Sequence, residues 1–334
     1  MTTRRETARL RRLVRRFGRA RLVVAGDLIA DEFIYGQLDR VSREAPVLIL
    51  RYDATEVVPG GAGNAAANAA ALGARVDVVG LAGRDQAGDR LVAALADRRA
   101  RTRHVVRPPR YVTPVKTRIL AGGVHSAKQQ VVRIDRAGGG AGPAATRRFE
   151  AALARAARSA DAMILSDYGS GLLTPELWRR VEASVPPARR PLVFVDSRYA
   201  LAGFTGLTAC TPNESEVEAL LGIRIGDDRD RLEGAGRTLL RDLGCRAVLV
   251  TRGSRGMALF EPGRPTDHIP IVGSDEVADV TGAGDTVIAT FALAVAAGAS
   301  FGDAARLANV AGGLVVMKRG TATVTADELR QALR

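Results

Sequence analysis

Short runs of valine, isoleucine and leucine recur along the chain, and alanine-rich stretches with helical spacing of apolar residues lie between them. The apolar runs predict strands at 22–26, 76–80, 162–166, 192–196 and 247–251. The amphipathic stretches predict helices at 64–72, 86–96, 146–158, 214–221, 283–297 and 303–317. This alternation is typical of an α/β fold with a doubly wound, mainly parallel sheet that helices cover on both faces.

Two segments, about 32–58 and 112–135, break the alternation because they contain strand-like residues without helical partners. We expect them to pair into a small β-sheet. The ligand crevice of an open α/β sheet lies beyond the carboxyl ends of its strands, so a small sheet inserted there is placed to act as a lid. The glycine-rich run 138–142 then connects the lid back to the main domain.

Positive charge is the most unusual feature of the composition. The 334 residues carry a net charge of +13, concentrated in 1–21 and 98–118. The first segment predicts a basic amphipathic helix before a domain of residues 22–334. The second is compatible with a solvated surface and with an anionic ligand across the cleft. Binding of nucleic acid is a distant alternative, because the chain has no helix-turn-helix or RNA-binding motif.

The cysteines and the hydropathy indicate a cellular compartment. Cys210 and Cys245 have no spacing that suggests a disulfide framework or a zinc site. No apolar run approaches the roughly 18 residues of a membrane span, and the arginine-rich start is unlike a signal peptide. We therefore expect a cytoplasmic protein with no membrane partner.

The segment DVTGAGDT at 279–286, followed by an apolar helix, carries the strongest chemical signal. Free N–H groups at a helix start attract anions, so Gly282, Ala283 and Gly284 are predicted to bind a phosphoryl group. Asp285 has two interpretations, a helix cap or a general base. The glycines favour the general base, because a carboxylate beside a phosphate-binding site is placed to accept the proton of the attacking hydroxyl. The chain has no GxxxxGK[ST] motif, which excludes a P-loop kinase.

A second glycine-rich segment, PGGAGN at 59–64, precedes an alanine-rich helix. Gly60 and Gly61 expose backbone amides to a polyol, while Asn64 offers both a donor and acceptors. Together the two segments resemble the motifs of the ribokinase (PfkB) family of carbohydrate kinases. The resemblance implies a ribokinase-like fold with a lid, ATP as the phosphoryl donor, a sugar hydroxyl as the acceptor, and Asp285 as the catalytic base.

Further matches to the family extend over almost the whole chain. Asp27 and Asp31 follow the first strand, where members of the family place sugar-binding acids, although capping of a turn is an alternative for Asp27. The NESE segment at 213–216 implies that Glu216 holds Mg²⁺ near the ATP phosphates, and helix capping is its alternative.

The same resemblance implies a nucleotide site and a cation site. For ATP it implies Asn213, Thr251, Gly253, Gly256 and Asn309. For an activating monovalent cation, K⁺ in particular, it implies Asp279 and Thr281, together with Arg319, Gly320 and Thr323.

Within the family, segments such as VSREAPV at 41–47 resemble the kinase domain that phosphorylates D-glycero-β-D-manno-heptose 7-phosphate at O1, its anomeric hydroxyl. A phosphorylated sugar needs a cationic pocket, so the predicted substrate residues include Lys116, Arg118, Arg133 and Asp135. Lids of this kind often pair between two chains, which implies a homodimer. The run 120–128 lengthens a lid turn beside the acceptor, so a kinase for another sugar, sugar phosphate or nucleoside is the alternative.

Overall fold

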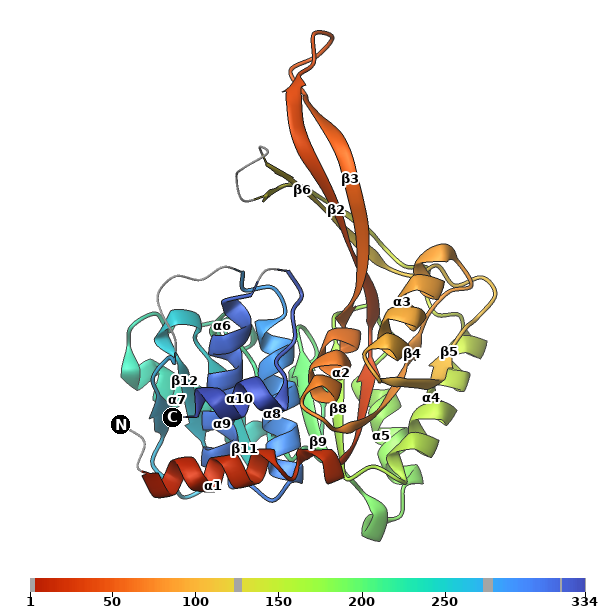
Figure 1. Ribbon diagram of the computed structural model, residues 1–334. Helices are drawn as coiled ribbons and strands as arrows, with labels where there is room; N and C mark the ends of the chain where they lie inside the picture. Colours follow the sequence, from red (N-terminus) through yellow and green to blue (C-terminus); the bar gives the residue numbers. More distant parts are fainter. Residues whose placement is uncertain (1–3, 123–127, 273–278, 319, 334) are drawn as a thin grey trace.

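A twisted nine-stranded sheet forms the centre of the molecule (Figure 1). The computed structural model describes residues 4–122, 128–272, 279–318 and 320–333. The strand order is β13-β12-β11-β10-β9-β8-β1-β4-β5, parallel from β11 to β5 and antiparallel at β12 and β13. The strands are β1 (Arg21–Gly26), β4 (Arg75–Leu81), β5 (Arg101–Val106), β8 (Ala162–Asp167), β9 (Leu192–Ser197), β10 (Ala209–Cys210), β11 (Ala247–Thr251), β12 (Met257–Phe260) and β13 (Asp267–Ile269).

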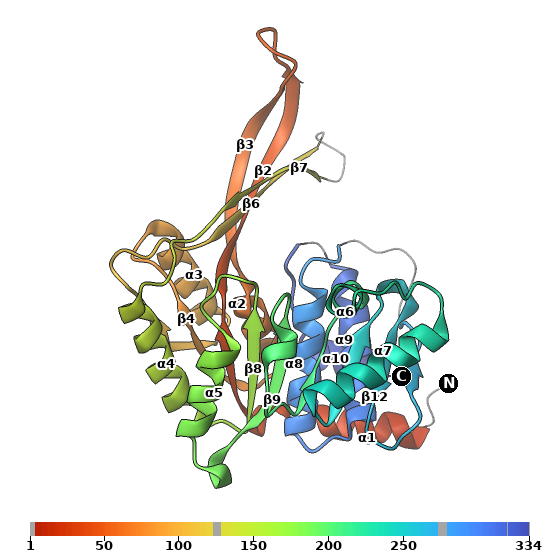
Figure 2. The ribbon, with the colours of Figure 1, turned by 180° about the vertical axis from the view of Figure 1, so that it is seen from behind.

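Helices cover both faces of this sheet because successive residues of each strand point to opposite sides. Leu22 and Val24 of β1 pack into one apolar core, while Val23 and Ala25 pack into the other. The first core includes residues from α1 (Arg4–Val14), α2 (Ala62–Ala71), α3 (Gln86–Asp97), α8 (Ala283–Ala296), α9 (Phe301–Val316) and α10 (Ala326–Ala332). The second includes residues from α4 (Pro143–Ala157), α5 (Pro175–Ser184), α6 (Glu214–Leu221) and α7 (Arg229–Leu243), which Figure 2 shows in front. The predicted doubly wound α/β fold is confirmed.

A separate four-stranded sheet projects from the main body, and we call it the lid. Its strands are β2 (Leu28–Val41), β3 (Leu48–Gly61), β6 (Val115–Gly122) and β7 (Gln129–Arg136), in the order β3-β2-β6-β7. The β2–β3 hairpin forms a long arm that extends far beyond the helices (Figure 1). The predicted small sheet is thus present, although most of the predicted long turn at 120–128 lies outside the described residues.

Some element boundaries differ from the sequence prediction. Helix α4 begins at Pro143, three residues earlier than expected, since proline needs no N–H partner in a first helical turn. Helix α9 begins at Phe301, because the Ser300 side chain accepts a hydrogen bond from the Asp303 N–H and caps the helix. The pattern also missed several elements, namely α5, α7, α10, β5, β10, β12 and β13.

The two basic segments are built into the fold. Helix α1 buries Leu10, Leu13 and Val14 in the first core, and Arg9 forms a 2.7 Å ion pair with Asp303. In the second segment, Arg103 and Arg107 form ion pairs with acidic residues of β4 and α3. Part of the positive charge of these segments therefore has an acidic partner in the folded chain. None of the helices in the described ranges is long and apolar enough to cross a membrane.

Candidate active site

Two cavities meet at the carboxyl edge of the main sheet, beneath the lid. The larger, of about 710 Å³, and the smaller, of about 200 Å³, share Val280 in their walls. The first turn of α8 separates them, since Gly282 and Asp285 face the larger cavity while Ala283 and Gly284 face the smaller. Predicted residues that line the larger cavity are Asp27, Asp31, Gly61, Asn64, Lys116, Arg118, Arg133, Asp135 and Thr281. Those that line the smaller cavity are Thr251, Gly253, Gly256 and Asn309.

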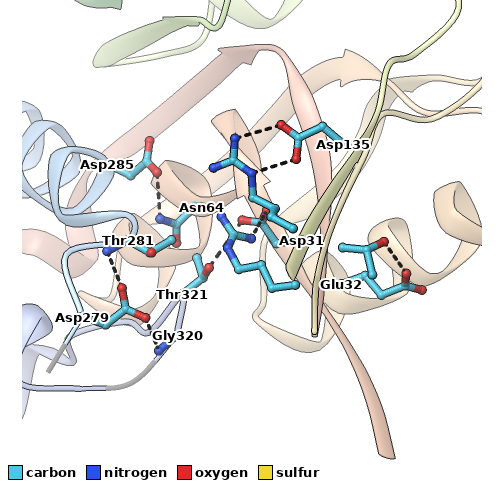
Figure 3. Close-up of polar contacts among 12 residues, drawn as sticks. Asp31, Glu32, Asn64, Asp135, Asp279, Thr281, Asp285, Gly320 and Thr321 are labelled. Atoms are coloured by element: carbon cyan, nitrogen blue, oxygen red, sulfur yellow. Dashed lines mark hydrogen bonds and ion pairs between the residues drawn. The ribbon is translucent and has the colours of Figure 1, made fainter. Parts of the chain in front are cut away.

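Asp285 lies in the first turn of α8 and is 5% exposed. One carboxylate oxygen accepts a hydrogen bond from Asn64 Nδ2 at 2.8 Å, and the other accepts one from the Tyr168 hydroxyl at 2.9 Å. Figure 3 shows the contact with Asn64. Burial raises the pKa of Asp285 to about 6, even though both hydrogen bonds favour the carboxylate. The pKa of Asp285 is therefore close to the operating pH, where a general base is most effective.

Gly282 makes this arrangement possible. It caps α8 with φ = +78°, a left-handed conformation that strongly favours glycine. A Cβ at this position would lie 2.3 Å from Asn64 Nδ2, the atom that donates to Asp285. The N-terminal and C-terminal glycine motifs, more than 200 residues apart in sequence, are thus in direct contact at the site.

Asp27 and Asp31 lie at the start of the lid and are both buried. Asp27 accepts hydrogen bonds from the backbone N–H groups of Tyr168 and Ser170 and from the Ser170 hydroxyl. Burial nevertheless raises the pKa of Asp27. Asp31 accepts from Arg118 Nη1 at 2.8 Å and from the Thr321 hydroxyl at 3.4 Å (Figure 3). Both acids keep further acceptor positions for ligand hydroxyl groups.

Gly60 and Gly61 complete this wall by letting two backbone segments approach closely. A Cβ at Gly60 would lie 2.4 Å from Asp31 Oδ2, and one at Gly61 would lie 2.5 Å from the carbonyl oxygen of Asp27. Gly61 has φ = +57° and lines the larger cavity. In the structure these glycines make room for the two buried acids, a role that the sequence did not suggest.

Among the described residues, four cations line the larger cavity, three of them from the lid: Lys116, Arg118 and Arg133. The fourth is Arg198, which follows β9. The ion pair of Arg118 with Asp31 is buried, whereas the Arg133 pair with Asp135, at 2.9 Å, is about half exposed (Figure 3). Burial lowers the pKa of Lys116, whose ammonium group lies 5.4 Å from the Tyr168 ring centroid.

The smaller cavity is mostly apolar and is formed by the loop after β11, the start of α8 and the middle of α9. Asn309 Nδ2 donates a 2.7 Å hydrogen bond to the carbonyl oxygen of Pro270, which fixes its position in the wall. Gly256, with φ = +76°, packs against the backbone of Ile269, where a side chain would clash. The predicted nucleotide residues Thr251, Gly253 and Gly256 are thus brought together with Asn309.

Asn213 and Glu216 are not among the described residues that line the two cavities. They form a capping box at the start of α6, with both reciprocal hydrogen bonds at 2.9 Å. The capping alternative is therefore present in the structure. Burial also raises the pKa of Glu216, and burial together with the negative charges of Asp285 and Glu216 raises that of Asp196. Two carboxylates whose charged forms are disfavoured would both gain from a bound cation.

Asp279 joins the two loops on which a monovalent cation site was expected. Its carboxylate accepts from the Thr281 N–H at 2.9 Å and from the Gly320 N–H at 3.1 Å (Figure 3). Lys318 Nζ donates to the carbonyl oxygen of Thr323 at 2.7 Å, so that oxygen already has a cationic partner. Arg319 lies outside the described residues.

Sequence reasoning missed several residues of the larger cavity, among them Tyr168, Ser170, Arg198 and Thr321. The first three follow β8 or β9, so the rule that ligands bind at the carboxyl ends of parallel strands was a usable signal for them. Thr321 gave no such signal. The glycine-rich connection also lines the cavity, through Gly138, Gly139 and Gly140.

A buried carboxylate thus lies between a polar cavity and a smaller apolar cavity, at the edge of the doubly wound sheet where ligands bind in such folds. The pfkB family of carbohydrate kinases matches residues 20–328. The chain therefore belongs to the pfkB family of carbohydrate kinases.

Curated relatives and solved structures agree with this family. The chain is 41% identical over 322 residues to bifunctional protein HldE of Caulobacter vibrioides, covering 96% of this chain and 65% of that protein. It is 40% identical over 313 residues to bifunctional protein HldE of Geobacter sulfurreducens, covering 93% of this chain and 62% of that protein. The chain thus spans less than two thirds of the length of these relatives.

The solved structures show the same fold at lower identity. Ribokinase of Arabidopsis thaliana complexed with ribose and ATP superposes with a TM-score of 0.73 and 23% identity, covering 94% of this chain and 99% of that chain. Phosphofructokinase-2 of Escherichia coli in complex with fructose-6-phosphate has a TM-score of 0.75 and 18% identity, covering 94% and 97%. Both confirm the predicted ribokinase-like fold.

Proposed function

We propose that the chain transfers the γ-phosphoryl group of ATP to O1 of D-glycero-β-D-manno-heptose 7-phosphate. The observation that carries this proposal is the position of Asp285, a buried carboxylate at the wall between the two cavities. The choice of acceptor is supported by the lid segments that resemble heptose 7-phosphate kinases and by the relatives at about 40% identity.

In this mechanism Asp285 accepts the proton of the attacking sugar hydroxyl in the larger cavity. The start of α8 at Gly282, Ala283 and Gly284 is proposed to stabilise the charge on the transferring phosphoryl group, and the Ala283 N–H, which donates to the carbonyl oxygen of Val280 at 3.2 Å in the structure, would have to exchange this partner. The residues proposed to bind the sugar hydroxyls are Asp27, Asp31, Gly60, Gly61, Asn64 and Asp135. The residues proposed to bind the phosphate of the acceptor are Lys116, Arg118 and Arg133.

The smaller cavity is the proposed site of the nucleotide, with its apolar walls suited to the adenine ring. The residues assigned to ATP are Asn213, Thr251, Gly253, Gly256 and Asn309. Glu216 is assigned to Mg²⁺, which when bound would neutralise charge on the ATP phosphates. Its raised pKa fits a role in cation binding. Asp279 and Thr281 are the proposed contacts of an activating K⁺ ion.

A panel of acceptors tests the proposed substrate. Purified protein with ATP and Mg²⁺ should phosphorylate the heptose 7-phosphate with a higher kcat/KM than ribose, fructose 6-phosphate or a nucleoside. The unphosphorylated heptose serves as the matched control, since it lacks only the group that the basic residues are proposed to bind. A higher kcat/KM for any other acceptor would contradict the assignment of the heptose.

We also propose that the protein acts as a homodimer in the cytoplasm, where ATP is available and Cys210 and Cys245 stay reduced. The lid supports the dimer, because Leu38, Val132 and Ile134 are each between 45% and 49% exposed on it. Exposed apolar side chains on a projecting sheet are typical of a surface that a partner covers. Light scattering should give twice the mass of the chain, and Val132→Glu should shift it toward that of a monomer.

A further inference from the structure

The four cations that line the larger cavity, within the described residues, differ in whether they form a close ion pair. Arg118 and Arg133 each form an ion pair, with Asp31 at 2.8 Å and with Asp135 at 2.9 Å. Within the described ranges of the chain, no carboxylate lies within ion-pair distance of Lys116 or Arg198. The carboxylates that act on them electrostatically, Asp31 and Asp135 on Lys116 and Asp196 and Glu216 on Arg198, are not in close ion pairs with them, so both cationic groups stay available to a ligand in the cavity.

Lys116 and Arg198 come from different parts of the fold and converge on one side chain. Lys116 lies on β6 of the lid, and Arg198 follows β9 of the main sheet. The Lys116 ammonium nitrogen is 5.4 Å from the centroid of the Tyr168 ring, and the Arg198 guanidinium carbon is 5.1 Å from it. The aromatic ring offsets part of the repulsion between the cations, but it carries no full negative charge.

The surroundings of Tyr168 place this cation pair next to the reacting atoms. The Tyr168 hydroxyl donates to Asp285 at 2.9 Å, and its backbone N–H donates to Asp27 at 2.8 Å. An anion held by Lys116 and Arg198 would therefore lie in the same cavity as the proposed general base. Arginine and lysine are the side chains that most often bind phosphate, through charge-assisted hydrogen bonds.

We propose that Lys116 and Arg198 together bind one phosphoryl group, as a clamp between the lid and the main sheet. The identity of this phosphoryl group rests on the proposed function. The group is either the phosphate that the acceptor already carries or the γ-phosphoryl group in transfer. Arg118 contributes less to this site, because its guanidinium is held by the Asp31 carboxylate. Arg198 is thus a binding residue that neither glycine motif indicates.

The test combines two variants with two matched controls. Lys116→Met and Arg198→Met remove the charges and keep most of the side-chain length. Lys128→Met is the lid control, because Lys128 lies 5.5 Å from the Tyr35 ring centroid and does not line the cavity. Arg246→Met is the control for the main domain, because its guanidinium lies 5.4 Å from the Phe301 ring centroid, away from the site.

Binding of inorganic phosphate, measured by isothermal titration calorimetry, is the first readout and needs no knowledge of the sugar. The wild type and both controls should bind phosphate, and each cavity variant should bind it roughly tenfold to a hundredfold more weakly, as expected for loss of a charge-assisted contact. A chain that uses an acceptor other than the heptose would still show this loss. The phosphate titration can thus refute the proposed role of Lys116 and Arg198 independently of whether the heptose is the acceptor.

Steady-state kinetics with the acceptor that the wild type prefers then identify the source of the phosphoryl group. If the cavity variants raise the KM of the phosphorylated acceptor, leave kcat unchanged and do not affect the unphosphorylated sugar, the clamp binds the acceptor phosphate. A fall in kcat for both kinds of acceptor assigns it to the group in transfer. The proposal is overturned if the wild type binds no phosphate, if only one variant is affected, or if both stay within about twofold of the controls.

Discussion

Replacement of Asp285 by asparagine is expected to separate catalysis from stability. The change keeps the shape of the side chain and removes the group that accepts the proton of the sugar hydroxyl. General-base catalysis is typically worth 10²–10⁴ in rate, so kcat should fall by about 100-fold or more. The binding of ATP should change little, because the Asp285 carboxylate faces the larger cavity rather than the smaller one.

The effect on stability follows from the pKa. The folded chain raises the pKa of Asp285 from 3.8 to about 6, so the native state binds this proton more tightly than the unfolded state does. Stability contributed by this group is therefore complete below pH 3.8 and is lost as the pH rises through 6. At about 1.4 kcal/mol per pH unit, the ionised carboxylate costs about 3 kcal/mol at neutral pH.

The variant does not pay this cost, and its amide can accept from Asn64 and donate to the Tyr168 hydroxyl. Asp285→Asn should thus melt at a higher temperature than the wild type at pH 8, with the difference vanishing near pH 4. Thermal unfolding at both pH values, with turnover assays, measures the two effects. Asp303→Asn, a buried acid in the first turn of α9, is the control that should keep full turnover. Near-wild-type turnover of Asp285→Asn would refute the base assignment, and a lower melting temperature at pH 8 would refute the stability argument.

Three further predictions, one of them with a matched control variant, test other parts of the site. Tyr168→Phe removes a hydrogen-bond donor to the Asp285 carboxylate and should therefore raise the pKa of Asp285. In a pH–rate profile the acidic limb of kcat/KM, expected near pH 6 in the wild type, should move up by about one pH unit. Arg118→Met leaves its buried carboxylate partner unpaired and should lower the free energy of unfolding by about 3–5 kcal/mol in urea titrations. Gly282→Ala forces a left-handed residue and should cost at least about 1–2 kcal/mol, whereas Gly284→Ala, with open space around its Cβ, should be tolerated in thermal melts.

Five strands of the main sheet, β1, β4, β8, β9 and β11, were predictable because they are largely buried and read as continuous apolar runs, as in the segment 247–251. Helix α7 was missed for a physical reason that only the packing reveals. It contains Gly234 and Gly236, which lower helix propensity, yet a Cβ at Gly236 would lie 2.3 Å from the Phe260 ring. The glycine is present to make room for an aromatic side chain of β12.

Asp285 and the glycines of the candidate site lie in the two glycine motifs, and Asp27 and Asp31 follow the first predicted strand, but the pairing of the charges could not be predicted. The contact between Asp31 and Arg118 depends on the parallel register of β2 and β6, which places Asp31 opposite Lys116. Register between segments about 85 residues apart is a tertiary property. For the same reason the convergence of Lys116 and Arg198 on Tyr168 could not be read from the sequence.

The most direct test of the proposed reaction is phosphorus NMR of the product formed from ATP and D-glycero-β-D-manno-heptose 7-phosphate. The account predicts a sugar bisphosphate whose new phosphorus signal is coupled to the anomeric proton, because transfer is to O1. Asp285→Asn should give almost none of this product under the same conditions. A new phosphate on any other hydroxyl, or no sugar product while another acceptor is phosphorylated, would contradict the account.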